Sequence, residues 1–192
     1  MKSFFIGIAG GSGSGKTRLV KELKRYFGRK ASILHLDCYQ RFGEKLPKIY
    51  GMENWECPEA VNWDKLLKDL ISLKNGKAIR AEIRDEHKKL KLIGTTILYP
   101  TEIIIIEGYL LFCKKSIRDV LDFLIYLKAS DKTRIKRRTK FKNDKYERKI
   151  LLPMHRKYIE PTKRFADLIL NTEKYSIKEC SNKIIRHLLD RF

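Results

Sequence analysis

The chain has 192 residues, 43% of them hydrophobic and 34% charged, with a formal net charge of +20. The length suits one domain, and a composition with 5 Pro, 11 Gly and no low-complexity tract excludes a disordered or fibrous chain. The apolar segment 4–10 is too short to span a membrane and lacks a signal-peptide cleavage pattern, so we expect a cytoplasmic protein with no membrane association.

The positive charge comes from 43 Lys and Arg against 23 Asp and Glu. A surface of this kind attracts polyanions, and nucleic acid is one such partner. The basic residues are spread over the whole chain rather than confined to one stripe, which disfavours specific nucleic-acid binding without excluding it. The formation of a homo-oligomer is also left open.

Strand-like apolar segments alternate along the chain with segments of helical periodicity. The expected strands are 4–9, 32–36, 103–106, 123–127 and 168–170, and the expected helices are 16–27, 63–73, 131–140, 151–160 and 176–191. The unbroken isoleucine run at 103–106 is typical of a central strand buried on both faces. This order predicts an α/β fold with a central parallel sheet flanked by helices and with ligands at the carboxyl ends of the strands.

Residues 79–99 interrupt this alternation. Apolar residues alternate with polar ones on both sides of the polar turn 85–88, which predicts an antiparallel β-hairpin inserted beside the sheet. No internal repeat and no linker rich in Gly, Ser or Pro divides the chain, so we expect a single domain over residues 1–192.

A glycine-rich loop lies between the first expected strand and the first expected helix. Its residues match G-x-x-x-x-G-K-[ST] and are Gly10, Gly11, Ser12, Gly13, Ser14, Gly15, Lys16 and Thr17. Glycine lets the backbone curl with its N–H groups inward, and the helix that follows adds partial positive charge, so the loop suits a phosphate. The Lys16 ammonium would reach the β- and γ-phosphates and the Thr17 hydroxyl would ligate Mg²⁺, which predicts the binding of ATP with Mg²⁺.

Two acidic residues stand where expected strands end. Asp37 follows the second strand, in position to accept the proton of an attacking hydroxyl or to help hold the metal. Glu107 closes the isoleucine run, where an acid that supports the metal belongs. A GTPase is disfavoured because no Asn-Lys-x-Asp motif follows a later strand, and a motor ATPase is disfavoured by the size of the chain. The pattern favours a kinase.

Three arginines, Arg134, Arg137 and Arg138, are spaced i, i+3 and i+4 in an expected helix. This spacing puts them on one helix face, which suits the neutralisation of the negative charge that spreads over phosphate oxygens during phosphoryl transfer.

In order along the chain, these segments resemble the uridine kinase and nicotinamide riboside kinase group of P-loop nucleoside kinases, over nearly the whole length. The matching pieces are 7–17 (GIAGGSGSGKT), 36–39 (LDCY), 54–60 (NWECPEA), 106–112 (IEGYLLF), 134–138 (RIKRR) and 158–167 (YIEPTKRFAD). The resemblance implies that Asp37 is the base facing the ribose 5′-hydroxyl and that Thr17, Asp37 and Glu107 surround the magnesium. It also implies that the three arginines begin a lid over residues 134–150 and that the hairpin, 79–99, lies on the substrate side.

The same resemblance suggests residues for the nucleoside pocket. Glu56 falls where the family has an Asp that grips the ribose hydroxyls, so the acid is retained with one more methylene. Tyr39 is placed to line the sugar or the base, and His87 is the counterpart of a base-contacting histidine in the hairpin. The Tyr-Asp pair that uridine kinases show in this hairpin is missing.

We therefore expect a P-loop kinase that uses ATP and Mg²⁺ to phosphorylate a uridine- or cytidine-like nucleoside at its ribose 5′-hydroxyl. Nicotinamide riboside, pantothenate or another small alcohol is the alternative acceptor. A nucleic-acid-binding ATPase or a polynucleotide 5′-kinase is the alternative of a different class. Lys16, Asp37 and the three arginines are the expected catalytic residues.

Overall fold

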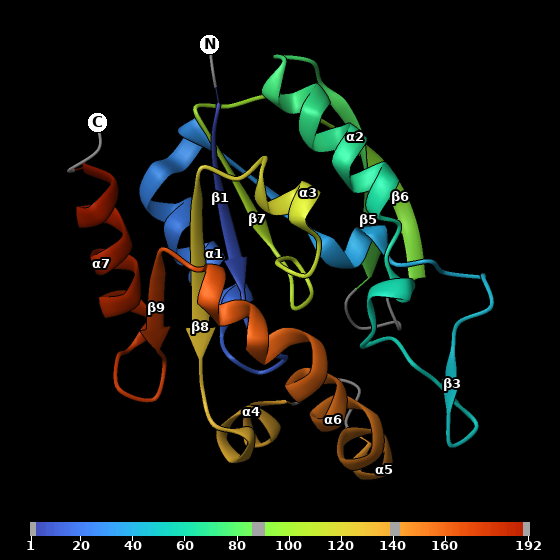
Figure 1. Ribbon diagram of the computed structural model, residues 1–192. Coiled ribbons are helices and arrows are strands. Elements are labelled where there is room, and N and C mark those ends of the chain that lie inside the picture. Colours follow the sequence, from blue (N-terminus) through green and yellow to red (C-terminus); the bar gives the residue numbers. More distant parts are fainter. Residues whose placement is uncertain (1–2, 86–90, 139–142, 190–192) are drawn as a thin grey trace.

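The computed structural model describes residues 3–85, 91–138 and 143–189. Its centre is a five-stranded sheet in the order β2-β7-β1-β8-β9, in which all neighbouring strands run parallel (Figure 1). The strands are β1 (Phe4–Ala9), β2 (Ala31–His35), β7 (Ile103–Glu107), β8 (Phe123–Lys128) and β9 (Leu168–Asn171). The predicted α/β fold with a parallel sheet is confirmed, and each predicted strand is found within one or two residues.

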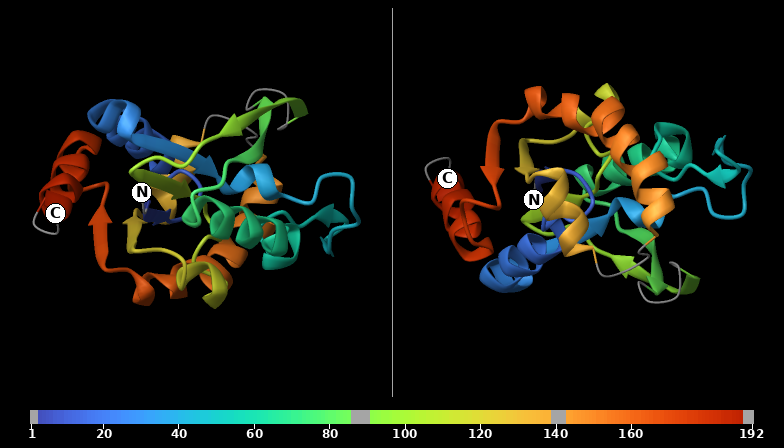
Figure 2. Two further views of the ribbon diagram at one scale, coloured as in Figure 1. Left: turned by 90° about the horizontal axis from the view of Figure 1, so that it is seen from above. Right: turned by 90° about the horizontal axis from the view of Figure 1, so that it is seen from below.

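Helices cover both faces of this sheet (Figure 2). Buried side chains of α1 (Lys16–Phe27) and α7 (Ile177–Leu189) pack with Ile103 and Ile105 on one face. Those of α2 (Trp63–Lys74) and α3 (Lys115–Arg118) pack with Ile104 and Ile106 on the other. Successive side chains of a strand point to opposite faces. Alternate residues of the isoleucine run therefore pack into the hydrophobic cores on the two faces of the sheet, as the sequence indicated.

The carboxyl ends of the strands, at the bottom of Figure 1, are covered by helices from the second half of the chain. These are α4 (Asp131–Arg137) and a helical run made of α5 (Asp144–Tyr146), η4 (Glu147–Leu151), α6 (Leu152–Met154), η5 (His155–Ile159) and η6 (Glu160–Phe165). Both η4 and η5 are π-helical turns, and Pro153, which has no backbone N–H to donate, lies between them. The run begins seven residues earlier than the helix expected at 151–160, because the Asn143 side chain caps it by accepting from the Tyr146 N–H.

The helix expected at 131–140 is shorter than predicted. Helix α4 ends at Arg137, and Arg138 has an extended backbone with φ −73° and ψ 112°. Residues 139–142 lie outside the described part of the chain. Arg138 is therefore outside the regular helix, and the three arginines do not form one helical face.

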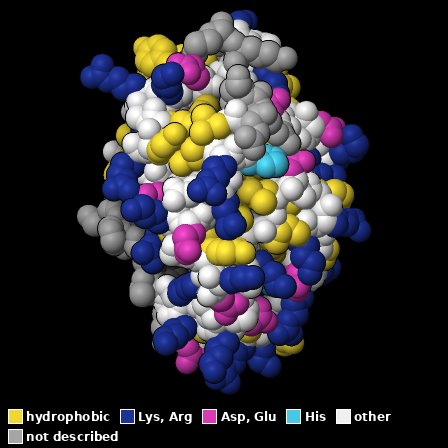
Figure 3. Space-filling model, turned by 90° about the vertical axis from the view of Figure 1, so that its left-hand side faces the viewer, with side chains coloured by type: hydrophobic (Ala, Val, Ile, Leu, Met, Phe, Trp, Pro, Cys, Tyr) yellow, Lys and Arg dark blue, Asp and Glu magenta, His cyan; other side chains and the backbone are white. Residues whose placement is uncertain are grey.

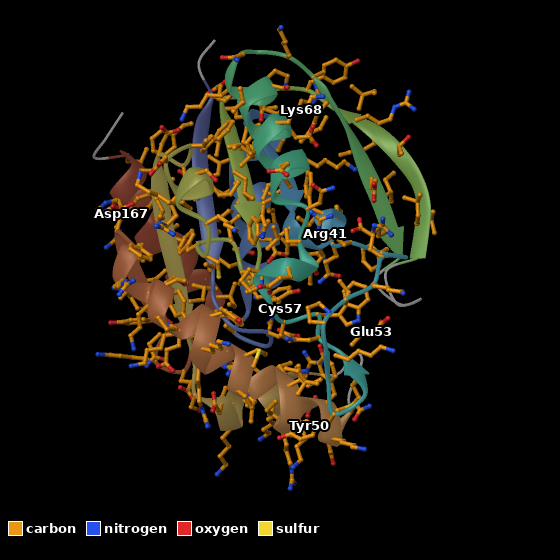
Figure 4. The ribbon with its side chains drawn as sticks, turned by 45° about the vertical axis from the view of Figure 1, so that its right-hand side comes forward. Arg41, Tyr50, Glu53, Cys57, Lys68 and Asp167 are labelled. Carbon is orange, nitrogen blue, oxygen red and sulfur yellow. The ribbon has the colours of Figure 1, made fainter. Side chains whose placement is uncertain are left out.

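The predicted hairpin is present as β5 (Ile79–Asp85) and β6 (Lys91–Leu98), which pair antiparallel beside α2. A second, smaller hairpin was not predicted; its strands are β3 (Lys48–Ile49) and β4 (Met52–Glu53), and Tyr50 stands at its turn with φ 52°. Figure 4 labels Tyr50 beside the helical run, and the Lys149 ammonium lies 5.0 Å from the centre of its ring. The remaining short helical turns are η1 (Gly28–Lys30), η2 (Leu36–Tyr39) and η3 (Pro58–Ala60).

Basic side chains are scattered over the molecular face in Figure 3, the side on which α7 lies in Figure 1, and they are interrupted by acidic and apolar ones. This distribution agrees with the even spread of Lys and Arg along the sequence. In the described residues, no helix has the length and apolar character needed to cross a membrane.

Candidate active site

The phosphate loop, residues 10–17, connects β1 to α1 and depends on glycine. Gly13 and Gly15 have φ values of 82° and 101°, in the left-handed region that residues with side chains rarely adopt. A Cβ atom on Gly13 would also run into the backbone carbonyl of Arg134. Glycine thus allows both the curvature of the loop and its close contact with α4.

The amino end of α1 is open toward this loop. Its N-cap residue is Gly15, no side chain caps its N–H groups, and its first turn has no acidic residue. Free N–H groups and the helix dipole make such an end attractive to a phosphate. The buried Lys16 ammonium curls back over the loop and donates to the carbonyl oxygens of Gly10, at 2.9 Å, and Gly11, at 3.2 Å.

Three of the predicted acids lie near enough to Lys16 for their charges to act on its ammonium group. Burial lowers the pKa of the Lys16 ammonium, and the negative charges of Glu107, Asp37 and Glu56 act in the opposite direction. Asp37 is half-buried in η2, directly after β2, and Glu107 is the last residue of β7. Since β7 lies between β1 and β2, both acids come to the same edge of the sheet as the phosphate loop. The charge of Asp37 therefore acts on the Lys16 ammonium at the phosphate loop.

Glu107 is held by two hydrogen bonds to one of its oxygens. The Thr17 hydroxyl donates to Glu107 Oε1 at 3.1 Å, and the His35 Nδ1 atom lies 2.9 Å from the same oxygen. Burial alone would raise the pKa of Glu107, but the hydrogen bond from His35 and the charge of Lys16 lower it below its usual value. The carboxylate is therefore ionised at neutral pH.

The donor set here fits a magnesium ion. Thr17 gives its hydroxyl hydrogen to Glu107, which leaves the lone pairs of the hydroxyl oxygen available to a cation. Hard cations such as Mg²⁺ take oxygen ligands and are commonly bound through one or two carboxylates together with substrate phosphates. Thr17, Glu107 and the neighbouring Asp37 supply this chemistry next to the phosphate loop.

Arg134 is buried against the phosphate loop, with 1% of its side chain exposed. Its Nη1 atom donates to the Ser12 carbonyl oxygen at 3.2 Å, and its Nη2 atom pairs with Asp131 at 2.7 Å. The other carboxylate oxygen of Asp131 pairs with Arg156 in η5 at 2.8 Å. This ion-pair network ties α4 to the helical run above the loop.

The other two arginines have different partners. Arg138 donates from Nη1 to the Ser12 hydroxyl at 2.7 Å and from Nε to the buried Glu147 at 3.0 Å. Arg137 donates instead to the side chain and the backbone carbonyl of Thr172, both at 2.8 Å. The structure thus brings Arg134 and Arg138 to the phosphate loop, whereas Arg137 reaches it only through Thr172, whose hydroxyl donates to the Ser14 carbonyl.

Glu56 is almost fully buried, and its charge acts on the Lys16 ammonium. Burial and the charge of Asp37 raise its pKa to about 7, although the charges of Arg138, Lys16 and Arg134 act to lower it. Its Oε2 atom is buried and has no hydrogen-bond partner among the described residues. Figure 4 labels its neighbour Cys57 between the sheet and the helical run. A buried carboxylate oxygen without a partner at this position is a ready acceptor for a ligand hydroxyl.

A cavity of about 180 Å³ lies beyond Asp37, between η2 and the β5–β6 hairpin. Tyr39 lines it, and its hydroxyl donates to Asp69 of α2 at 2.8 Å. The hairpin contributes Glu82 and Arg84, which pair with each other. His87 lies outside the described residues.

Two histidines at this site were not singled out by the sequence. His35 contacts Glu107. The only sequence feature that could have indicated a role for His35 is its position as a polar residue at the end of an expected strand, two positions before Asp37. His155 is buried above Gly11, and its Nδ1 atom has no hydrogen-bond partner among the described residues. Burial and the charge of Arg134 lower the pKa of His155 to about 4, so it is neutral. His155 and Gly11 are far apart in the sequence, so only the folded structure shows that they lie close together.

A family model described as "Phosphoribulokinase / Uridine kinase family" matches residues 5–176. The chain belongs to this family. A uridine kinase of Staphylococcus aureus is 34% identical to it over 196 residues, which cover 93% of this chain and 94% of that protein. A uridine kinase of Halobacterium salinarum is 31% identical over 201 residues, or 98% of this chain and 85% of the relative.

Solved structures of the phosphoribulokinase/uridine kinase family share the fold. A "Possible Uridine Kinase from Bacillus stearothermophilus" is similar with a TM-score of 0.63 at 22% identity, covering 88% of this chain and 89% of that one. The phosphoribulokinase from Rhodobacter spheroides is similar with a TM-score of 0.66 at 15% identity, covering 88% and 70%. The family membership, together with these P-loop kinase neighbours, makes the protein a kinase.

Proposed function

We propose that this kinase transfers the γ-phosphoryl group of ATP to the ribose 5′-hydroxyl of a nucleoside, uridine or cytidine, in the presence of Mg²⁺. The observation that carries the proposal is the arrangement around Lys16, where a phosphate loop, a metal-binding pair and two further carboxylates meet. The uridine kinase relatives, which match nearly the whole chain, support the choice of acceptor.

The donor half of the reaction is assigned to residues 10–17 with Glu107. In this assignment the loop N–H groups and Lys16 bind the triphosphate, and Lys16 exchanges its two carbonyl partners for phosphate oxygens. Thr17, Asp37 and Glu107 would hold Mg²⁺, which when bound neutralises phosphate charge and orients the phosphates. Arg134 and Arg138 contact Ser12 and would stabilise the charge on the transferred group, and Arg137 would support them through Thr172.

The acceptor half is assigned to Asp37 and Glu56. The 5′-oxygen forms a bond to the γ-phosphorus as the bond from that phosphorus to the β–γ bridging oxygen breaks, and Asp37 takes the hydroxyl proton. Glu56 would accept hydrogen bonds from the ribose hydroxyls with its unpartnered oxygen. Tyr39 and His87 stay predicted members of the nucleoside pocket. Because phosphoryl transfer needs little covalent help, positioning and electrostatics provide most of the catalysis.

A panel of acceptors tests the proposal. ATP consumption is measured with uridine, cytidine, nicotinamide riboside, pantothenate and a 5′-hydroxyl oligonucleotide. We expect kcat/KM for uridine or cytidine to exceed that for every other acceptor. A higher kcat/KM for the oligonucleotide would instead make the protein a polynucleotide 5′-kinase, and a higher one for nicotinamide riboside or pantothenate would replace the substrate.

Asp37→Asn tests the assignment of the base. The amide keeps the shape of the side chain and cannot accept the proton, so we expect kcat to fall by about 10²- to 10⁴-fold while nucleotide binding persists. The turnover rate is compared with the melting temperature of each protein. A folded Asp37→Asn protein that retains full turnover would remove Asp37 as the base.

A further inference from the structure

His35 is the last residue of β2 and stands directly across from Glu107 in the parallel pairing of β2 with β7. This register brings an imidazole from the edge strand to the acid at the end of the central strand, although the two residues are 72 positions apart in the chain. The His35 side chain is 38% exposed and the Glu107 side chain 8% exposed. His35 is therefore not a core residue, and it contacts the site through its hydrogen bond to Glu107.

The direction of this hydrogen bond follows from the chemistry of its partners. An ionised carboxylate only accepts hydrogen bonds, so the hydrogen is on His35 Nδ1, and that nitrogen donates whether the ring is neutral or protonated. Thr17 donates its hydroxyl hydrogen to the same oxygen, Glu107 Oε1. One carboxylate oxygen is thus held by two donors from two different elements, β2 and α1.

The two hydrogen-bond donors, Thr17 and His35, have different roles in the proposed reaction. Thr17 is itself an expected metal ligand, and its hydroxyl will adjust to the cation and the phosphates when they bind. His35 is not among the expected metal ligands, and it lies on the edge strand β2 beside Glu107 of β7. It can keep the carboxylate in place while Thr17 changes partners.

We propose that His35 is a positioning residue for the divalent cation: by donating to Glu107 Oε1 it fixes the carboxylate beside Thr17 and so sets the cation affinity of the nucleotide site. This inference rests on the proposed function, because it assumes that the cation binds together with ATP. Hydrogen-bond partners that orient metal ligands typically contribute about 10- to 100-fold to metal affinity or activity.

The test compares a variant that keeps the N–H donor with one that removes it. His35→Asn retains a side-chain N–H in a smaller residue, whereas His35→Leu fills similar space without a donor. His187→Leu is the matched control, because that imidazole belongs to α7, stacks on Phe123 and is not part of the site. Binding of Mn²⁺ to each protein is followed by electron paramagnetic resonance in the presence of a non-hydrolysable ATP analogue, and thermal melts verify the folds.

We expect His35→Leu to weaken Mn²⁺ binding by about tenfold or more, and His35→Asn and His187→Leu to stay within about threefold of the unsubstituted protein. The Mg²⁺ concentration for half-maximal turnover should shift in the same way, with the KM for the nucleoside unchanged. Equal Mn²⁺ affinity in His35→Leu and the unsubstituted protein would overturn the proposal, and so would equal losses in His35→Leu and His35→Asn, because the loss would then not depend on the N–H donor.

The Mn²⁺ measurement needs no acceptor, so it separates this inference from the proposed function. If no nucleoside is phosphorylated but His35→Leu still loses Mn²⁺ affinity, the proposed function fails and the role of His35 stands. If the unsubstituted protein binds no Mn²⁺ with the nucleotide analogue, both fail.

Discussion

The phosphate-loop side and the acceptor side of the site differ in how completely the protein satisfies its own polar groups. On the loop side, Lys16 donates to two carbonyls, and Thr17 and His35 both bond Glu107. On the acceptor side, Glu56 is equally buried, yet one of its oxygens has no hydrogen-bond partner among the described residues. The loop side is assembled without a ligand, whereas the proposed acceptor side keeps a carboxylate oxygen that has no partner in the described part of the chain and that a substrate hydroxyl would satisfy in the proposed reaction.

The difference in hydrogen bonding between Glu56 and Glu107 affects the stability of the folded protein. A buried carboxylate without full hydrogen bonding destabilises the folded protein, and the raised pKa of Glu56, about 7, expresses that cost. The ionised and paired Glu107 has its pKa lowered instead. Two carboxylates that both act on Lys16 therefore have opposite effects on stability at neutral pH. Substitutions at Lys16, at the two neighbouring arginines and at Glu56 test the contrast between the two sides of the site.

Lys16→Met removes the ammonium group at the phosphate loop and should have the largest effect on turnover. Without the ammonium, the triphosphate loses a charge-assisted contact at the transferred group, so we expect kcat to fall by about 10²- to 10³-fold or more. Lys24→Met is the control, because Lys24 lies on the same helix but donates to carbonyls at its far end. Turnover of Lys24→Met should match the unsubstituted protein, and a similar loss in both variants would refute a specific role for Lys16.

Arg138→Lys and Arg137→Lys separate the two neighbouring arginines. Arg138 bridges Ser12 and Glu147 with two nitrogens of one guanidinium, which a lysine ammonium cannot reproduce, so we expect kcat to fall by about tenfold or more. Arg137 contacts Thr172 rather than the loop, and its variant should lose less than about threefold. Steady-state kinetics decide between them. Equal losses would show that Arg137 acts on the phosphates directly.

Glu56→Gln should change the acceptor side alone. Loss of the charge weakens the hydrogen bonds to the nucleoside, and we expect KM for the nucleoside to rise by about tenfold or more with the ATP KM unchanged. Tyr39→Phe is its control, because the hydroxyl that it removes is bound to Asp69, and its nucleoside KM should change by less than about threefold. A rise in the ATP KM of Glu56→Gln would place Glu56 on the loop side instead.

The same variant carries a prediction for stability against pH. The pKa of Glu56 rises from 4.5 to about 7 on folding, so the folded state binds the proton more tightly than the unfolded state. The free energy of unfolding should therefore fall as pH rises through this window, by up to about 3 kcal/mol, and Glu56→Gln should abolish this fall. Urea unfolding at pH 5 and pH 8 measures it. A stability difference between the two proteins that is the same at both pH values would contradict the assignment.

The elements that position the loop side could be predicted from the sequence because its parts are contiguous or end a strand. Residues 10–17 carry their own motif, and the five strands follow from local apolar runs. The pairing of His35 with Glu107 depends on the register between β2 and β7, which no local pattern specifies.

The acceptor side and the arginines depended on longer-range features. Nothing in the segment around Glu56 signals that this acid is buried, because the burial comes from packing with distant elements. The spacing of Arg134, Arg137 and Arg138 indicated a common face, but α4 ends before Arg138 and breaks the helical geometry on which that prediction relied. The small β3–β4 hairpin has strands of two residues each, too short for a periodic signal.

The close approach of Gly13 to the backbone of Arg134 limits how this enzyme can be redesigned. A nucleotide-binding loop taken from another kinase that carries any side chain at this position would collide with main-chain atoms, which no choice of rotamer can relieve. Chimeric enzymes whose loop lacks glycine at this position would therefore have to exchange residues 10–17 and 131–138 as one module, and random libraries should yield active members with a side chain at position 13 only when the α4 segment varies with it.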